Sequence, residues 1–205
     1  MRTLAILLMC SSVCGAQVPR EALPYRNDLI RESRAVWGME APVATFAGQI
    51  HQESRWNASA KSPVGAAGMA QFMPATASWI CGFAKDLPPG CNVLNPNWAI
   101  RALVTYDKYL YDRTPKVGNT CGRMWAALRG YNGGLGHWNK EWQNAGRPSN
   151  LKLADASCGT ASRAIKHCRE NLTYPEKIVT RWQPLYNKAG WGAGVCDYPD
   201  VECLQ

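Results

Sequence analysis

Residues 53 to 77 constrain the fold and chemistry of this chain more than any other segment. The segment reads ESRWNASAKSPVGAAGMAQFMPATA, in which a carboxylate is followed by a Gly-rich stretch, a lone amide and a Met-Pro helix start. Upstream, apolar residues recur at helical spacing, and Glu53 continues their stripe. Apolar surroundings and the negative end of the helix dipole both favour a neutral carboxyl. The pattern therefore predicts that Glu53 is a proton donor near neutral pH.

An alternative is that Glu53 ends a helix in solvent, as most glutamates do. The residues that follow it weigh against this alternative, because the segment resembles the first motif of the soluble lytic transglycosylases. These are family 1 enzymes of lysozyme-like fold that cut the glycan strands of peptidoglycan. The matching positions are Glu53, Ser54, Ala60, Ser62, Gly65, Ala66, Gly68, Met69, Gln71, Met73, Pro74, Thr76 and Ala77.

Further matches follow in the order of the family. Tyr131-Asn132-Gly133-Gly134 resembles the family's Tyr-Asn turn, and Glu170, Tyr174 and Ile178 have the spacing of its closing motif. The matches cover roughly residues 35 to 187. The resemblance implies a single, mainly α domain of the goose-type lysozyme and SLT kind over this range.

The resemblance also implies a reaction. Glu53 first protonates the bond between N-acetylmuramic acid and N-acetylglucosamine, and its carboxylate then takes the proton from the muramyl 6-hydroxyl. That hydroxyl attacks the anomeric carbon and leaves a 1,6-anhydro sugar, so the enzyme is a lyase that needs no metal and no other cofactor.

Five further residues receive roles from the same resemblance. Ser54 and Gln71 are expected to bind sugar groups or to orient the intermediate. Tyr131 is expected to position the acid through its hydroxyl, Asn132 to hold the neighbouring turn, and Tyr174 to border the cleft. Nearby, Glu170 is compatible with either a structural or a functional role.

Two other functions remain open from the sequence. A hydrolytic muramidase on the same fold would use an activated water, and a second carboxylate such as Asp86 or Glu141 would have to reach the cleft. A cell-wall-binding or assembly component without activity is the other alternative, although the intact Glu53 argues against it. The context also stays open between wall turnover, a secretion or conjugation apparatus, and a phage.

The basic composition agrees with an anionic polymer as partner. The formal net charge is +8 and the pI is about 9.1. Lys and Arg are scattered rather than clustered, and no nucleic-acid-binding motif is recognisable. We therefore expect the cell wall, and not a nucleic acid, to be the partner. The alternative is that the positive charge only aids solubility.

The first 16 residues have the pattern of a signal peptide. A basic start is followed by an apolar run and by Cys14-Gly15-Ala16, while the alternative is a buried N-terminal helix. No later run approaches the ~20 apolar residues of a membrane span, so no integral membrane segment is expected after leader removal. We expect export to the periplasm or cell envelope, with secretion or association with a virion as alternatives.

Cysteine usage agrees with export. Two of the nine cysteines lie in the predicted leader, and the remaining seven favour disulfides with one thiol left over. The short spans Cys81–Cys91 and Cys196–Cys203 are the first pairings to expect. The histidines show no shared ligand spacing with the cysteines, so a structural zinc site is not expected.

The remaining organisation is predicted as follows. An extended lead-in covers 17–34, and residues 188–205 form an irregular, Cys-containing tail. Helices are expected at 35–54 and 74–81, after Asn95-Pro96, at 124–128, and from Pro175 onward. Residues 139–160 are expected to form an inserted loop beside the cleft. Trp56 and Trp138 are candidates for stacking on glycan.

Overall fold

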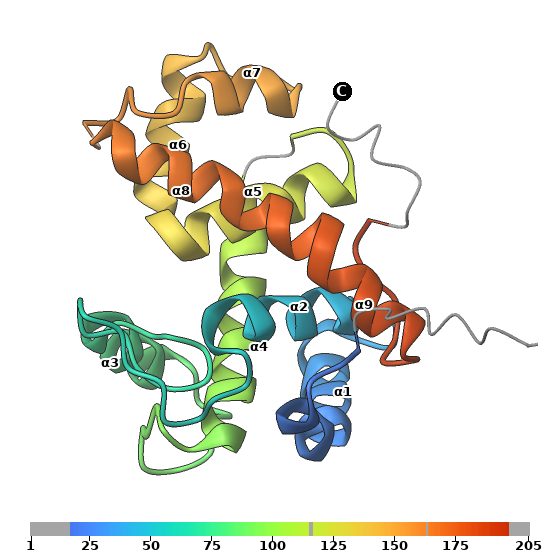
Figure 1. The fold of residues 1–205 in the computed structure, drawn as a ribbon. Helices are drawn as coiled ribbons and strands as arrows, with labels where there is room; N and C mark the ends of the chain where they lie inside the picture. Colours follow the sequence, from blue (N-terminus) through green and yellow to red (C-terminus); the bar gives the residue numbers. More distant parts are fainter. Residues whose placement is uncertain (1–16, 115–116, 163, 197–205) are drawn as a thin grey trace, which may run out of the picture.

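The computed structural model describes residues 17–114, 117–162 and 164–196. The predicted leader and Cys203 therefore lie outside the described residues. Most of the described chain is helical, and no strand occurs in it beyond two isolated bridges (Figure 1). The prediction of a mainly α domain is confirmed. None of the helices in these ranges is long and apolar enough to cross a membrane.

Most connections between the elements are short, but residues 55–73 and 84–95 form longer ones. In chain order the elements are η1 (Arg20–Tyr25), α1 (Arg26–Trp37), α2 (Val43–Ser54), α3 (Pro74–Phe83), α4 (Pro96–Arg113), α5 (Thr120–Gly133), α6 (Leu135–Asn144), α7 (Leu151–Ala156), α8 (Ile165–Glu176), the π-helix η2 (Lys177–Trp182) and α9 (Gln183–Lys188).

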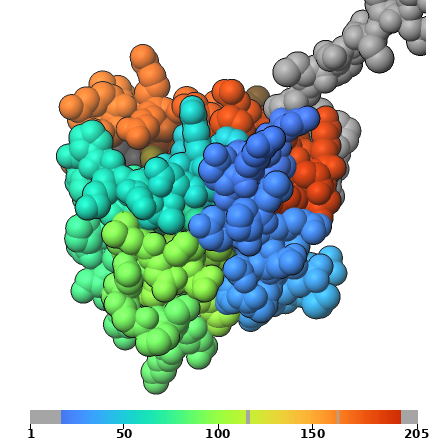
Figure 2. Space-filling model, turned by 60° about the horizontal axis from the view of Figure 1, so that its bottom comes forward, coloured from blue at the N-terminus to red at the C-terminus, as the bar shows by residue number. Residues whose placement is uncertain are grey.

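The N-terminal part differs from the prediction. The segment expected to be an extended lead-in forms η1 and most of α1, and the helix expected over 35–54 is two helices. Gly38 separates them with a φ of 84°, a value that favours glycine. α1 buries Leu29 and Ser33 and packs mainly on α4. Figure 2 shows these N-terminal residues, in blue, on the surface between the cyan and green segments and the red C-terminal helices.

α2 lies at the centre of the fold. Every residue from Val43 to His51 is buried, and the helix packs on η2 and α9. Gly48 permits this close approach, because a Cβ there would lie 3.0 Å from the Gln183 nitrogen and 3.1 Å from the Trp182 Cβ. The core thus fixes α2 rigidly, including the turn that carries Glu53.

The C-terminal helical segment that packs on α2 begins earlier in the chain than expected. The helix predicted to start at Pro175 starts at Ile165, and Pro175 lies in the last turn of α8, one residue before that helix ends. The inserted loop expected over 139–160 is also mostly wrong, because α6 and α7 occupy much of it. Together with α5 and α8, these helices form the upper part of Figure 1.

Three disulfides join the described cysteines. The expected Cys81–Cys91 bridge is present, whereas the expected Cys196–Cys203 pairing is wrong because Cys196 bonds to Cys121. The third bridge, Cys158–Cys168, ties the segment after α7 to α8.

The bridges are expected to contribute unequally to stability. Cys121–Cys196 closes a separation of 75 residues and Cys81–Cys91 one of 10. Loop-closure entropy predicts that replacing the first pair with alanine lowers the free energy of unfolding by about 4 to 5 kcal/mol, against about 3 kcal/mol for the second. Urea unfolding of the two double variants checks this order. An equal loss for both pairs would contradict it.

Candidate active site

Glu53 lies in the last turn of α2, as the sequence predicts. The helix ends at Arg55, which adopts the left-handed region with a φ of 53° and donates its N–H to the His51 carbonyl at 3.0 Å. Trp56 follows with a φ of 69°. Two consecutive left-handed residues reverse the chain sharply, so the following loop folds back beside Glu53.

Internal bonds hold this loop in one shape. The Gln71 amide nitrogen donates to the carbonyls of Gly68 at 2.8 Å and Ala60 at 3.2 Å. Gly68 has a φ of 78°, and a Cβ there would lie 1.9 Å from the Val93 carbonyl oxygen, so only glycine fits. These hydrogen bonds and this close approach therefore hold the Gly-rich stretch in one defined conformation.

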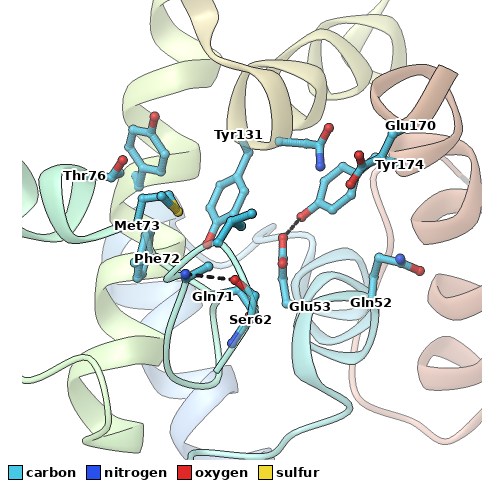
Figure 3. A pocket seen from close by; sticks show the side chains of 14 residues that line it. Gln52, Glu53, Ser62, Gln71, Phe72, Met73, Thr76, Tyr131, Glu170 and Tyr174 are labelled. Carbon is cyan, nitrogen blue, oxygen red and sulfur yellow. Dashed lines mark hydrogen bonds between the residues drawn. The ribbon is translucent and has the colours of Figure 1, made fainter. Parts of the chain in front are cut away.

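A pocket of about 380 Å³ opens between this loop, α2, α3, α4, α5 and α8 (Figure 3). It brings together five of the six predicted site residues. The lining residues are Gln52, Glu53, Ser62, Val64, Ala66, Gln71, Phe72, Met73, Thr76, Tyr106, Tyr131, Asn132, Glu170 and Tyr174.

The tyrosine that holds Glu53 is not the expected one. The Tyr174 hydroxyl donates to Glu53 Oε1, whereas the Tyr131 hydroxyl donates to the Ala70 carbonyl at 2.7 Å. The prediction that Tyr131 positions Glu53 through its hydroxyl is therefore wrong. The two rings stack at 6.4 Å, and Tyr131 fixes the loop that carries Gln71.

Ser54 is the predicted site residue that the structure does not bring to the pocket. Successive helical residues point about 100° apart, and Ser54 is not among the lining residues. Its hydroxyl is buried and has no hydrogen-bond partner among the described residues. Trp56 and Trp138 are also buried, at 2% and 0% exposure, so the expected stacking on glycan is not possible for either.

Burial raises the pKa of Glu53 to about 8. The hydrogen bond from Tyr174 acts in the opposite direction, and the negative charge of Glu170 adds to the rise. Burial also raises the pKa of Tyr131 and Tyr174 well above the usual range, so both hydroxyls stay protonated. Glu53 is thus mostly a neutral acid at pH 7.

Sequence reasoning missed several residues of the site. Gln52 and Tyr106 line the pocket but belong to no matched motif, and no sequence signal separates them from other polar and aromatic residues of their helices. Glu170, which was open to either role, lines this pocket. It also lines a second cavity of about 340 Å³ with Asn132 and His137. No group of three or more potential metal ligands was found in the described ranges.

Solved structures define the class of this domain. Lytic transglycosylase Slt from Pseudomonas aeruginosa, solved as an inactive mutant, matches with a TM-score of 0.64 at 20% identity over 87% of this chain and 26% of that chain. The soluble lytic transglycosylase SLT70 from Escherichia coli matches with a TM-score of 0.62 at 24% identity, over 84% of this chain and 26% of that chain. These likenesses show a lysozyme-like, mainly helical fold.

The sequence narrows this class to one family. Residues 32–153 match the family model described as "Transglycosylase SLT domain", which is more than half of the chain. The chain therefore belongs to the SLT transglycosylase family. Tyr174 lies beyond the matched range, so its contact with Glu53 is a finding of the structure and not of the family match.

Curated relatives agree over a shorter range. Membrane-bound lytic murein transglycosylase F of Shewanella frigidimarina is 36% identical over 92 residues, which is 45% of this chain and 18% of that protein. Soluble lytic murein transglycosylase of Escherichia coli is 37% identical over 93 residues, 42% of this chain and 14% of that protein. The matches thus span less than a fifth of the length of either relative.

Proposed function

We propose that the protein is a peptidoglycan lytic transglycosylase, a carbon–oxygen lyase that cleaves the β-1,4 bond between N-acetylmuramic acid and N-acetylglucosamine. The main support is one observation: a glutamic acid with a raised pKa lies in a pocket, held by Tyr174. Membership of the SLT family gives this acid its expected chemistry.

In the proposed mechanism, Glu53 donates its proton to the glycosidic oxygen as the bond breaks. A carboxyl with a pKa near 8 holds this proton at neutral pH and is a strong enough base to take another one back. It then accepts the proton of the muramyl 6-hydroxyl, which closes the 1,6-anhydro ring. Tyr174 donates to the same carboxyl and stabilises the carboxylate between the two steps.

Hydrolysis is a second candidate, but not through the carboxylates expected from the sequence. Glu141 is fully buried and paired with Arg129 at 2.8 Å, and Asp86 does not line the pocket. The carboxylate that does line it with Glu53 is Glu170. A muramidase would need Glu170 to activate water.

Analysis of the released muropeptides separates these candidates. We expect purified peptidoglycan to yield products ending in 1,6-anhydro-N-acetylmuramic acid, about 18 mass units lighter than hydrolysed ends because no water is added. Mass spectrometry with and without borohydride reduction measures this. Mainly reducible ends would establish the muramidase instead, and binding without any release would indicate a non-catalytic wall component.

We also propose that the enzyme acts in the cell envelope after export. The predicted signal peptide and the disulfides support this location. Peptidoglycan is the proposed partner, and wall turnover stands beside a secretion, conjugation or phage assembly as the candidate settings. Fractionation of cells that express the full chain tests the location.

A further inference from the structure

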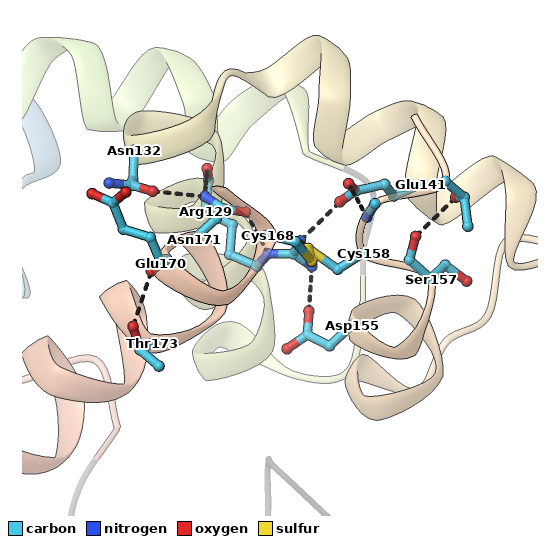
Figure 4. Close-up of a disulfide and its surroundings, with 12 residues drawn as sticks. Arg129, Asn132, Glu141, Asp155, Ser157, Cys158, Cys168, Glu170, Asn171 and Thr173 are labelled. Carbon is cyan, nitrogen blue, oxygen red and sulfur yellow. Dashed lines mark hydrogen bonds and ion pairs between the residues drawn. A yellow bond between two sulfur atoms is a disulfide. The ribbon is translucent and has the colours of Figure 1, made fainter. Parts of the chain in front are cut away.

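Asn171 on α8 joins the pocket to the buried interior. Its side chain is fully buried and makes three hydrogen bonds. Its amide nitrogen donates to the Arg129 carbonyl at 2.8 Å and to Asn132 Oδ1 at 3.1 Å, and its Oδ1 accepts from Arg129 Nε at 3.0 Å. Figure 4 shows Asn171 between Arg129 and Asn132. All the hydrogen-bonding capacity of this buried amide except one lone pair is thus used in a single orientation.

Arg129 makes that orientation rigid. The guanidinium is fully buried and bonds to Glu141 on α6 at 2.8 Å and to Asp155 on α7 at 2.5 Å. It also donates to Cys158 Sγ at 3.0 Å, on the disulfide that ties down α8. Charge-assisted bonds in a dry interior are short and directional, so Arg129 leaves Asn171 little freedom to rotate.

The fixed orientation of Asn171 determines which group of the Asn132 side chain is available at the pocket. Because Asn132 Oδ1 accepts from Asn171, the Asn132 NH₂ group is the part of this side chain left to donate to a ligand. Asn132 is exposed and lines both the catalytic pocket and the second cavity, so its amide lies where the two meet. Glu170 lies beside it (Figure 4) and lines both cavities too.

We propose that Asn171 is a positioning residue that fixes Asn132 as a hydrogen-bond donor to the glycan strand. The acceptor is a neutral oxygen of the substrate, such as a sugar hydroxyl or an acetamido carbonyl, at the junction of the two cavities. The identity of the ligand as a peptidoglycan glycan strand rests on the proposed function. It assigns no chemical step to Asn171, which touches neither Glu53 nor a reacting atom.

The Asn171→Asp substitution tests this proposal, because it should reverse the orientation of the Asn132 side-chain amide. Aspartate still accepts from Arg129 but cannot donate, so the Asn132 NH₂ should turn inward and its carbonyl outward. Loss of one donated bond is expected to raise KM for soluble glycan strands about fivefold to tenfold. The turnover number and the pH profile should stay nearly constant, because Tyr174 still holds Glu53. Asn144→Asp is the matched control, since the amide of Asn144 donates to Thr160 away from both cavities.

Two further variants keep the test decisive if Asn171→Asp folds poorly. Asn132→Asp keeps the bond from Asn171 but has no donor, so it should raise KM by the same factor. In an Asn132→Ala background, Asn171→Asp should change KM less than twofold, because residues acting through one contact are not additive. An unchanged KM for Asn132→Asp, or a full KM rise in the alanine background, overturns the proposal.

Binding of the N-acetylglucosamine tetramer, measured by calorimetry, separates this inference from the proposed function. The Kd should rise with the same pattern across the variants whether or not the wild-type protein cleaves peptidoglycan. Wild-type protein that binds the tetramer but releases no anhydro product would overturn the proposed function alone. A Kd that is identical in wild-type protein and Asn132→Asp would overturn the inference alone.

Discussion

Glu53→Gln is expected to lower the rate of peptidoglycan cleavage about a thousandfold or more, the upper range for loss of a general acid and base. Glutamine has nearly the same shape and can still accept the Tyr174 hydrogen bond, but it cannot donate a proton to the leaving oxygen or take one back. Release of anhydro-muropeptides per folded molecule measures the effect, with circular dichroism to confirm the fold.

Glu170→Gln is the matched control for this variant. It makes the same chemical change on the other carboxyl of the pocket. In a transglycosylase it should keep most of the activity and lower the pKa of Glu53, since the Glu170 charge contributes to the rise. The alkaline limb of the pH profile should move to lower pH. Loss of activity in Glu170→Gln together with full activity in Glu53→Gln would remove Glu53 from the mechanism.

The Glu53→Gln variant is also expected to be more stable than the wild-type protein at neutral pH. In the unfolded chain the carboxyl ionises near its ordinary pKa of 4.5, whereas in the folded protein it ionises near 8. The folded state therefore binds the extra proton between these values, and the free energy of unfolding falls as pH rises from 4.5 to 8. Glutamine does not ionise, so the variant does not lose this stability. Its free energy of unfolding should exceed that of the wild-type protein by roughly 1 to 3 kcal/mol at pH 7. Below pH 4.5 the two proteins should unfold alike.

Local signals predicted the parts of the fold that local chemistry decides. The Asn95 side chain accepts from the backbone of Asn97 at 2.9 Å, and proline follows at the first helical position, so α4 begins where the sequence indicates. Pro74 is likewise the first residue of α3, although no side chain caps that helix. Glu53 was found because an apolar stripe and a specific motif coincide on one residue.

Long-range packing decided the parts that sequence reasoning missed. α1 does carry apolar residues at helical spacing, but its position is set by packing on α4, a partner that lies about 70 residues later in the chain. Cys196 pairs with Cys121 across the fold rather than with a near neighbour. Buried Arg129 carries no signal in sequence, because arginine is mostly exposed unless it is paired. The same holds for Asn171, whose three bonds all depend on how α5 and α8 meet.

The choice between the two tyrosines gives the sharpest test of the site. Tyr131 and Tyr174 both lie in matched motifs, and only the placement of α5 and α8 relative to α2 in the folded chain determines which hydroxyl reaches Glu53. Tyr174→Phe is expected to lower activity about tenfold to a thousandfold, since a single donor to a developing charge in a dry site has effects of this size.

The pH profile distinguishes loss of this bond from general damage. The Tyr174 bond lowers the pKa of Glu53, so its removal should raise that pKa and move the alkaline limb of the profile to higher pH. Tyr131→Phe is the matched control. It loses the bond to the Ala70 carbonyl, which should cost about 1 to 2 kcal/mol of stability, while the alkaline limb stays in place. A shifted limb in Tyr131→Phe with no shift in Tyr174→Phe would return the positioning role to Tyr131.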